Sequence, residues 1–498
     1  MAKRLVVIVV CCLVPHLAMA QRTDPAVPSV HVVGPLPVSA DAYPFGAANH
    51  TRVPEDLKKV GYVEEEFFVS GVANVYEWPA DGPVRVRTAN APYTTRVLIR
   101  RPTDRARFSG NTVLEPLNPS NRFDLNIGWA ISHAQLVRSG DAWVGVTSKP
   151  ISVAALKAFD PARYAPLSWA NPLSESDPQN CTMVAGDSAR TSENGLIWDV
   201  LRQVGAWIKG RDSSNPLTYG QRNQASVQRL YAWGYSQSGN FLVTYLNAIH
   251  PLDVRALGKP LFDAYFIAVP GGLTAIHQCA QAPAPGDPRR PIANAGVPVM
   301  RLVTLSEYLR VEKRQDGDAA PNLFRHYEIA GAAHATPDEL TFAAAPGDIT
   351  KAGVPVPPMD CNEGPRSRFP NSVAFNAALR NLDEWVRKGT APPRAEPIAV
   401  ENGKPVLDEY SNVKGGVRSP YVDVPTSTWT GSSTGASFCF IAGHEIRFDR
   451  ERLKQLYADH AAYVRAVRQS VTGLISRRFI VREDGGELIK QAETAQIP

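Results

Sequence analysis

Residues 229–249 (RLYAWGYSQSGNFLVTYLNAI) constrain the fold of this chain more than any other stretch. Their apolar residues form a continuous run up to Trp233 and then recur at helical spacing from Phe241, so the pattern changes from strand to helix within a few residues. A serine on so tight a turn has its hydroxyl lifted above a sheet, and the amides that follow it lie at a helix N-terminus. We therefore interpret Ser236 as a nucleophile on a strand–turn–helix.

This turn departs in one position from the usual G-x-S-x-G pattern. Gly234 stands two residues before Ser236, but Ser238 occupies the place of the second glycine, which is displaced to Gly239. Small residues are needed on both sides because the strand and the helix cross closely there, and serine is small enough. The alternative is a loop rich in serine and glycine before a helix, without a catalytic role.

Strands and helices alternate on both sides of this turn. The predicted strands lie at residues 62–69, 72–78, 94–100, 111–117, 142–147, 262–269, 298–304 and 324–329. The predicted helices lie at residues 129–138, 195–209 and 371–388. After early antiparallel strands, the alternating order predicts an α/β fold, with a mostly parallel central sheet, right-handed crossovers and flanking helices.

The two ends of the chain and one internal segment lie outside this alternation. Residues 1–20 have a charged start, a short apolar run and an A-x-A exit, which predicts a signal peptide and an exported, periplasmic or secreted protein. The run is too short to span a membrane, and no later stretch approaches a span. We expect one catalytic domain at 21–395, with a cap-like insertion at about 151–190 rather than an inert surface excursion. Residues 396–498 include an amphipathic helix after Asp449, so we expect this C-terminal extension to pack on the same domain.

A serine nucleophile needs a base, and the base needs an acid to hold its tautomer. On turns of this kind the order along the chain is serine, acid, histidine, each after a strand. His334 follows a predicted strand directly and lies among small residues, so we predict it as the base, with a structural histidine as the alternative. Glu307, three residues after the preceding strand, is the predicted acid rather than a solvated surface charge, and Asp316 and Asp318 are its rivals.

The oxyanion requires hydrogen-bond donors close to the nucleophile. The amide of Gln237 follows the serine directly and is the first predicted donor. The second is expected from the loop after Leu117, where Pro119 has no amide hydrogen, and we favour Asn118 over Ser120. The sequence holds no HExxH, paired CxxC, Walker or GxGxxG motif, so we expect chemistry without a metal or a cofactor.

Charge and cysteine content narrow the partners and the compartment. The net charge falls from +5 to +3 when Lys3 and Arg4 leave with residues 1–20, and no basic stripe is interleaved with aromatic residues, so we expect no nucleic acid partner. Four cysteines follow this segment, an even number that predicts disulfides in an exported protein and allows three pairings. Cys279 and Cys361 lie in loops near the predicted catalytic strand ends, which favours their pairing; free buried thiols are the alternative. The four are Cys181, Cys279, Cys361 and Cys439.

Six segments of the chain resemble a known group, the exported bacterial proteins described as α/β-hydrolase domain-containing, a divergent branch of the α/β-hydrolase superfamily. They are residues 61–71 (GYVEEEFFVSG), 117–124 (LNPSNRFD), 158–169 (AFDPARYAPLSW), 234–239 (GYSQSG), 331–335 (GAAHA) and 415–425 (GGVRSPYVDVP). The resemblance covers nearly the whole exported chain, extension included, and implies an α/β-hydrolase fold and carboxylic ester hydrolysis. In that family the acid is usually an aspartate where this chain has Glu307.

Three functions are compatible with these residues. The leading hypothesis is a serine esterase that cleaves a small-molecule or polymeric carboxylic ester through an acyl-enzyme on Ser236. A serine peptidase or amidase with the same triad is the nearest alternative, because ester and amide cleavage differ mainly in leaving-group protonation and pocket shape. The third is a ligand-binding protein in which the triad is present but unused.

Overall fold

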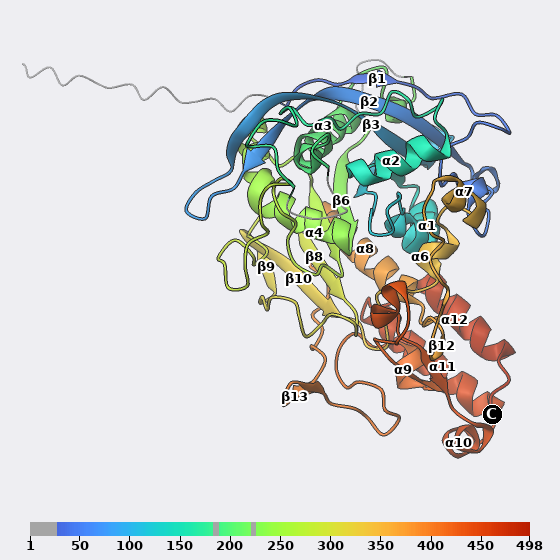
Figure 1. Ribbon diagram of the computed structural model, residues 1–498. Coiled ribbons are helices and arrows are strands. Elements are labelled where there is room, and N and C mark those ends of the chain that lie inside the picture. Colours follow the sequence, from blue (N-terminus) through green and yellow to red (C-terminus); the bar gives the residue numbers. More distant parts are fainter. Residues whose placement is uncertain (1–26, 183–188, 221–225) are drawn as a thin grey trace, which may run out of the picture.

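The computed structural model describes residues 27–182, 189–220 and 226–498 (Figure 1). Its largest element is a ten-stranded sheet. The strands of this sheet are β1 (His31–Val33), β2 (Tyr62–Glu77), β3 (Arg85–Pro102), β4 (Asn111–Pro116), β5 (Ala142–Val146), β6 (Arg229–Tyr235), β7 (Ala264–Ala268), β8 (Val299–Val303), β9 (Gly317–Ala319) and β10 (Asn322–Glu328). Their order across the sheet is β1-β2-β3-β5-β4-β6-β7-β8-β10-β9.

The centre of the sheet is parallel and its edges are antiparallel. Strands β5, β4, β6, β7, β8 and β10 run in the same direction, whereas β1, β2 and β3 on one edge and β9 on the other run against their neighbours. This order confirms the predicted mostly parallel α/β sheet with early antiparallel strands. The carboxyl ends of the parallel strands meet at one edge, and the loops that follow them carry the predicted site residues.

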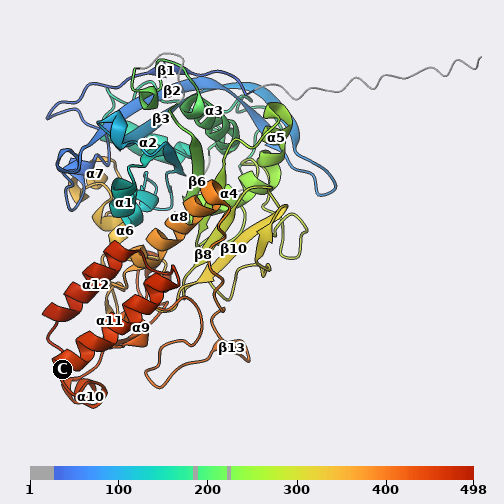
Figure 2. The same cartoon turned by 180° about the vertical axis from the view of Figure 1, so that it is seen from behind.

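Helices cover both faces of the sheet (Figures 1 and 2). Helices α1 and α8 pack against each other on one face, and α3 and α4 lie against strands on the other. The helices up to the end of α8 are α1 (Ile127–Ser139), α2 (Pro150–Phe159), α3 (Ile197–Lys209), α4 (Gln237–Thr244), α5 (His250–Leu257), α6 (Asp338–Thr341), α7 (Pro346–Lys351) and α8 (Asn371–Lys388). A π-helical turn (Tyr245–Ile249) joins α4 to α5, so the helix that follows Ser236 continues to the end of the predicted stretch.

The early strands differ from the prediction. The two strands predicted between residues 62 and 78 are one long strand, β2, and Gly71 lies inside it. A Cβ atom there would lie 2.4 Å from Oε1 of Gln203, so this glycine permits close packing and does not end the strand. Pro92 also lies inside a strand, β3, outside the stretch 97–100 that pairs with β5. Its missing N–H therefore costs no ladder bond on that side.

The insertion is more regular than the sequence indicates. Helix α2 occupies its first part, and an isolated bridge between Thr94 and Ser168 ties its middle to β3. Residues 183–188 of the insertion lie outside the described residues, as does the predicted signal peptide, residues 1–20. Within the described residues, no helix is both long and apolar enough to cross a membrane.

The cysteines pair differently from the favoured prediction. Cys181 in the insertion pairs with Cys279 after β7, with 5.3 Å between their Cα atoms. Cys361 pairs with Cys439 in the C-terminal extension, with 5.6 Å between their Cα atoms. The prediction of a Cys279–Cys361 disulfide was therefore wrong, because each of these cysteines meets a segment that the sequence does not show to be near.

The C-terminal extension carries a second hydrophobic cluster beside the main core. Val373 of α8 belongs to this cluster, which otherwise consists of extension residues such as Val471 and Leu488. The helices of the extension are α9 (Pro420–Asp423), α10 (Arg450–Leu456), α11 (His460–Ser476) and α12 (Arg482–Thr494). Its short strands are β13 (Val400–Glu401), β14 (Lys404–Pro405), β15 (Ser427–Trp429) and β16 (Glu445–Arg447), and the hairpin β11 (Asp360–Cys361) and β12 (Gly364–Pro365) precedes α8. Figure 2 shows α11 and α12 side by side below α8. The boundary at residue 395 stays a prediction.

Candidate active site

Ser236 lies on the turn between β6 and α4 in a backbone conformation that side chains rarely adopt, with φ 57° and ψ −119°. The crossing of strand and helix is tight: a Cβ atom on Gly234 would lie 2.3 Å from the backbone oxygen of Ser238, and one on Gly239 would lie 2.7 Å from that of Ala268. Such strain is characteristic of functional turns. The geometry therefore explains why both glycines are needed and why the serine hydroxyl stands at the carboxyl edge of the sheet.

Ser238 stabilises the turn in the place where glycine is usual. Its hydroxyl accepts a hydrogen bond from the amide of Tyr235 (2.9 Å) and donates one to the backbone oxygen of the same residue (3.0 Å). Because this hydroxyl folds back on the turn, the side chain is fully buried without an unpaired polar group. The displaced glycine is thus compatible with the predicted turn.

His334 lies in the loop after β10 and is held from two sides. Its amide donates to Oγ of Ser306 (3.1 Å), and the hydroxyl of Tyr235 donates to its backbone oxygen (2.6 Å). Its ring packs edge-on against the ring of Tyr235, with 5.4 Å between the ring centroids. Since Tyr235 directly precedes Ser236, the strand that carries the serine also positions the histidine loop.

Glu307 contacts the imidazole of His334. Its Oε2 lies 3.2 Å from Nδ1 of His334 and accepts a hydrogen bond from Oγ1 of Thr304 (3.0 Å). Its Oε1 accepts from the amide of Thr304 (2.5 Å), so the carboxylate is fixed at the end of β8. A carboxylate at Nδ1 leaves Nε2 as the nitrogen able to take a proton from a substrate or nucleophile.

The rival acids Asp316 and Asp318 lie elsewhere. Asp316 forms an ion pair with Arg325 of β10 at 2.7 Å, and Asp318 pairs with the same guanidinium and with Arg394 at 2.7 Å. Both carboxylates are thus held at the β9 edge of the sheet.

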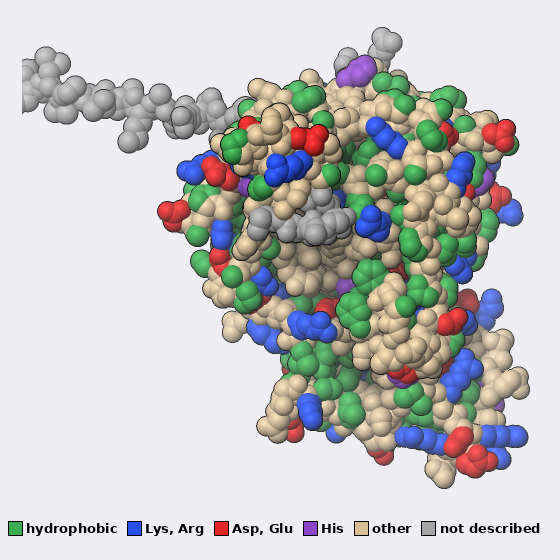
Figure 3. All heavy atoms as spheres, viewed as in Figure 1, with side chains coloured by type: hydrophobic (Ala, Val, Ile, Leu, Met, Phe, Trp, Pro, Cys, Tyr) green, Lys and Arg blue, Asp and Glu red, His purple; other side chains and the backbone are tan. Residues whose placement is uncertain are grey.

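Ser236 and His334 line one narrow cavity of about 20 Å³, which has room for about one water molecule. Its lining combines polar residues of the loop 118–121 with apolar residues, among them Phe438. Figure 3 shows one face of the molecule, which is hollowed near its centre and has positive and negative side chains interspersed over it. No group of three or more His, Cys, Asp or Glu side chains in the part of the chain that the structure describes is arranged to hold a metal ion.

The two predicted oxyanion donors differ in their surroundings. Gln237 is the first residue of α4, where helix amides have no partner within the helix. The amide of Asn118 donates to the backbone oxygen of Leu125 (2.9 Å), and its side-chain nitrogen donates to that of Tyr235 (2.7 Å). The amide of Ser120 donates to Oδ1 of Asn118 (2.8 Å). The side-chain amide of Asn118 has a second hydrogen, so it is able to donate to an oxyanion while it holds Tyr235. The amide of Ser120 is used by Asn118, and its role as a donor would require that bond to open.

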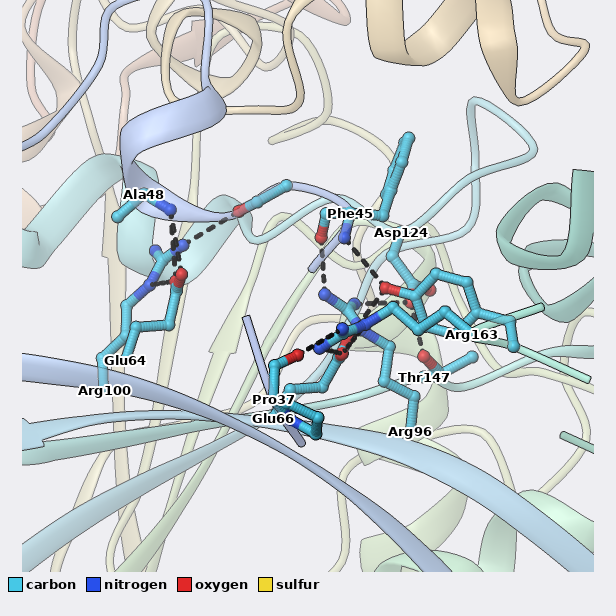
Figure 4. Close-up of polar contacts among 12 residues, drawn as sticks. Pro37, Phe45, Ala48, Glu64, Glu66, Arg96, Arg100, Asp124, Thr147 and Arg163 are labelled. Atoms are coloured by element: carbon cyan, nitrogen blue, oxygen red, sulfur yellow. Dashed lines mark hydrogen bonds and ion pairs between the residues drawn. The ribbon is translucent and has the colours of Figure 1, made fainter. Parts of the chain in front are cut away.

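A buried ion cluster anchors the loop that carries Asn118 (Figure 4). Asp124, at the end of this loop, lies 3.2 Å from Nη1 of Arg96, whose Nε lies 2.5 Å from Glu66 of β2. Arg163 of the insertion lies 2.6 Å from the same glutamate. Burial raises the pKa of the Asp124 carboxyl, and the Arg96 guanidinium opposes that rise. The cluster thus fixes both the loop and the insertion to the antiparallel strands.

Sequence reasoning missed a carboxyl group that lines the cavity, that of Glu339 in α6. Burial raises its pKa to about 7, although His334 and Arg366 oppose the rise, and the Arg366 guanidinium lies 3.9 Å away. A short helix begins directly after the histidine loop, but nothing in its pattern indicates which side chain faces the serine. Phe438 was also missed, because it comes from the extension and the sequence does not show that this segment lies near Ser236.

A family model of known proteins agrees with this architecture. Residues 32–490 match the family model described as "Alpha/beta hydrolase domain". No curated protein matches the chain. Among solved structures, the esterase Est22 is 13% identical, with 61% of this chain and 82% of that chain covered and a TM-score of 0.30. Two esterases of Rhizomucor miehei are represented by a structure at 11% identity, 60% and 88% coverage and a TM-score of 0.30. Est1E from Butyrivibrio proteoclasticus is 11% identical, with 54% and 94% covered and a TM-score of 0.26.

Proposed function

Because the chain belongs to the alpha/beta hydrolase domain family, we propose that it is a serine hydrolase that cleaves carboxylic esters through an acyl-enzyme on Ser236. One observation carries this proposal: Ser236 and His334 line the same cavity while Glu307 contacts Nδ1 of that histidine at 3.2 Å. These are the three groups that a serine nucleophile needs, in the order along the chain that is typical of such turns.

The reaction follows from these positions. Oγ of Ser236 attacks the ester carbonyl while Nε2 of His334 takes its proton, and Glu307 stabilises the imidazolium. The amide of Gln237 donates to the oxyanion, with Asn118 as the proposed second donor. The tetrahedral intermediate then expels the alkoxide, which receives the proton from His334 and leaves as an alcohol. In the second half, His334 takes a proton from water, which attacks the acyl-enzyme. The bond between the acyl carbon and Oγ of Ser236 then breaks, His334 returns the proton to Oγ, and the carboxylic acid is released.

Export is part of the proposal. The two disulfides support it, because disulfides persist in oxidising compartments such as the periplasm or the extracellular space.

The proposal is tested by labelling and hydrolysis with single variants. The wild-type protein should react with a fluorophosphonate probe and hydrolyse p-nitrophenyl acetate, and Ser236→Ala should lose labelling and on the order of 10⁴-fold or more in kcat. Glu307→Gln should lower kcat strongly and Glu307→Asp much less, since aspartate keeps the charge. Ser470→Ala, on α11 of the extension, is the matched control and should behave as wild type.

Two results would contradict it. If the Ser236→Ala variant kept full turnover or still reacted with the probe, Ser236 would not be the nucleophile. Faster cleavage of an amide than of the ester with the same acyl group would favour a peptidase or amidase instead.

A further inference from the structure

One wall of the cavity that holds the proposed nucleophile comes from the C-terminal extension. The 3₁₀ turn η7 (Ser437–Ile441) contributes Phe438 and Ile441 to the lining. Leu125 and Ile127, more than 300 residues earlier, also belong to the lining. The extension therefore reaches across the carboxyl edge of the sheet and meets the loop that precedes α1.

This segment is fixed on two sides. The backbone oxygen of Ile441 accepts hydrogen bonds from the amide of Ala335 (3.0 Å) and from Oγ of Ser306 (3.1 Å), both of which belong to the loops of the proposed histidine and acid. Cys439 is fully buried and is joined to Cys361 of the hairpin before α8. In the sequence, Phe438 lies between Ser437, the first residue of the turn, and Cys439 of this disulfide. It is thus held against the cavity by covalent and hydrogen-bonded neighbours.

The size of the cavity then limits what can enter beside Ser236. As the side chains stand, about 20 Å³ leaves room for about one water molecule, and the side chains of Phe438 and Ile441 offer no hydrogen-bond partner to a polar substituent. An acyl chain longer than acetyl that extended from Ser236 towards this wall would therefore meet Phe438 and Ile441.

We propose that Phe438 closes the acyl side of the cavity and makes the protein selective for esters of short acyl groups, acetyl in particular. This inference rests on the proposed esterase function. It assigns to the extension a direct role in substrate choice, since the selecting side chain lies about 200 residues after the nucleophile in sequence.

The test measures kcat/KM for p-nitrophenyl esters from acetate to octanoate. The wild-type value should be highest for acetate and fall with each added methylene. Phe438→Ala should move the optimum to butanoate or hexanoate, and each methylene that finds room should gain about fourfold, which corresponds to ~0.8 kcal/mol. The preferred acyl-chain length of Phe438→Leu should lie between those of wild type and Phe438→Ala. This variant provides the test if Phe438→Ala does not fold.

Phe440 offers a matched control. It lies in the same turn, its ring centroid is 6.3 Å from that of Phe438, and it is 56% exposed and does not belong to the cavity lining. Phe440→Ala should therefore keep the wild-type profile. The inference is overturned if wild type prefers long acyl chains, or if both folded Phe438 variants keep the wild-type ratio of octanoate to acetate. A complete lack of Ser236-dependent hydrolysis at every chain length would instead overturn the proposed function, and this inference with it.

Discussion

Removal of the buried Arg96 cation should destabilise the fold far more than removal of an exposed arginine. The side chain of Arg96 is 1% exposed and lies between the carboxylates of Glu66 and Asp124, which are 0% and 2% exposed (Figure 4). In Arg96→Met, Glu66 keeps Arg163 and the hydroxyl of Tyr164. Asp124 is left without a cation. Loss of one partner from a buried ion pair costs about 3–5 kcal/mol, because the remaining charge stays desolvated.

An exposed arginine in the neighbouring part of the same sheet provides the control. Arg85 lies 2.6 Å from Glu77, but their side chains are 69% and 39% exposed. Arg85→Met should therefore cost about 0–1 kcal/mol. The free energy of unfolding is measured by urea titration at pH 7 with disulfides intact, followed by tryptophan fluorescence and circular dichroism. The two probes should give coincident transitions, and the m-values should match wild type, so that a shift of the midpoint reports stability.

A double variant tests whether the cost arises from the stranded carboxylate. Asp124→Asn removes the charge that Arg96→Met leaves behind, so the double variant should be less destabilised than the sum of the single variants, with a coupling of about 1–3 kcal/mol. Additive effects would refute this reasoning, as would a cost for Arg96→Met no larger than that for Arg85→Met. Turnover provides a second readout, because the loop from Asn118 to Asp124 should lose its anchor.

Two further perturbations follow from the surroundings of the cavity. Burial raises the pKa of Glu339 from 4.5 to about 7, so its neutral form stabilises the fold below pH 4.5 and that contribution is lost as the pH rises towards 7. The free energy of unfolding, measured by urea titration across this pH window, should fall by about 3 kcal/mol less in Glu339→Gln than in wild type. Glu487→Gln, at an exposed position, should show the same pH dependence as wild type. If all three proteins showed the same pH dependence, the raised pKa of Glu339 would be contradicted. Replacing both Cys361 and Cys439 by alanine should lower the free energy of unfolding by about 4 kcal/mol and relax the selection of short acyl groups. The Cys181–Cys279 disulfide closes a loop of similar length, so its removal should lower the free energy of unfolding by a similar amount and leave the acyl selectivity unchanged. If removal of either disulfide altered the acyl selectivity equally, a specific role of Cys361–Cys439 would be disproved.

The sequence predicts best where the required geometry is local. The strand, the turn and the helix around Ser236 lie within 21 residues, and the positive φ of the serine explains why small residues surround it. The strands that precede Glu307 and His334 also follow from their apolar runs. Because parallel strands end at one edge, the order along the chain predicts that Glu307 and His334 lie on loops at the same edge, and the two side chains lie 3.2 Å apart. Their catalytic roles stay a prediction.

The errors have physical causes that the sequence does not carry. The predicted strands leave out Gly71 and Pro92, but a glycine can admit a neighbouring side chain and a proline can lie where no partner strand needs its N–H. The pairing of Cys279 and the position of Phe438 depend on which distant loops meet. Such contacts are decided by packing between segments far apart in the chain, and neither periodicity nor spacing reports them.

The extension, the acid loop and the histidine loop meet at one side chain, Ser306. Its hydroxyl accepts a hydrogen bond from the amide of His334 and contacts the backbone oxygens of Gly431 (2.6 Å) and Ile441 (3.1 Å). Ser306 also directly precedes Glu307 in the chain. Residue 431 must be a glycine, since a Cβ atom there would lie 2.5 Å from the Cβ atom of Leu305. The orientation of the proposed base therefore depends on the same hydroxyl that binds the wall of the cavity. A change in the extension that moves this wall would also move the histidine loop, so the proposed acyl selection and the proposed proton transfer share one structural support.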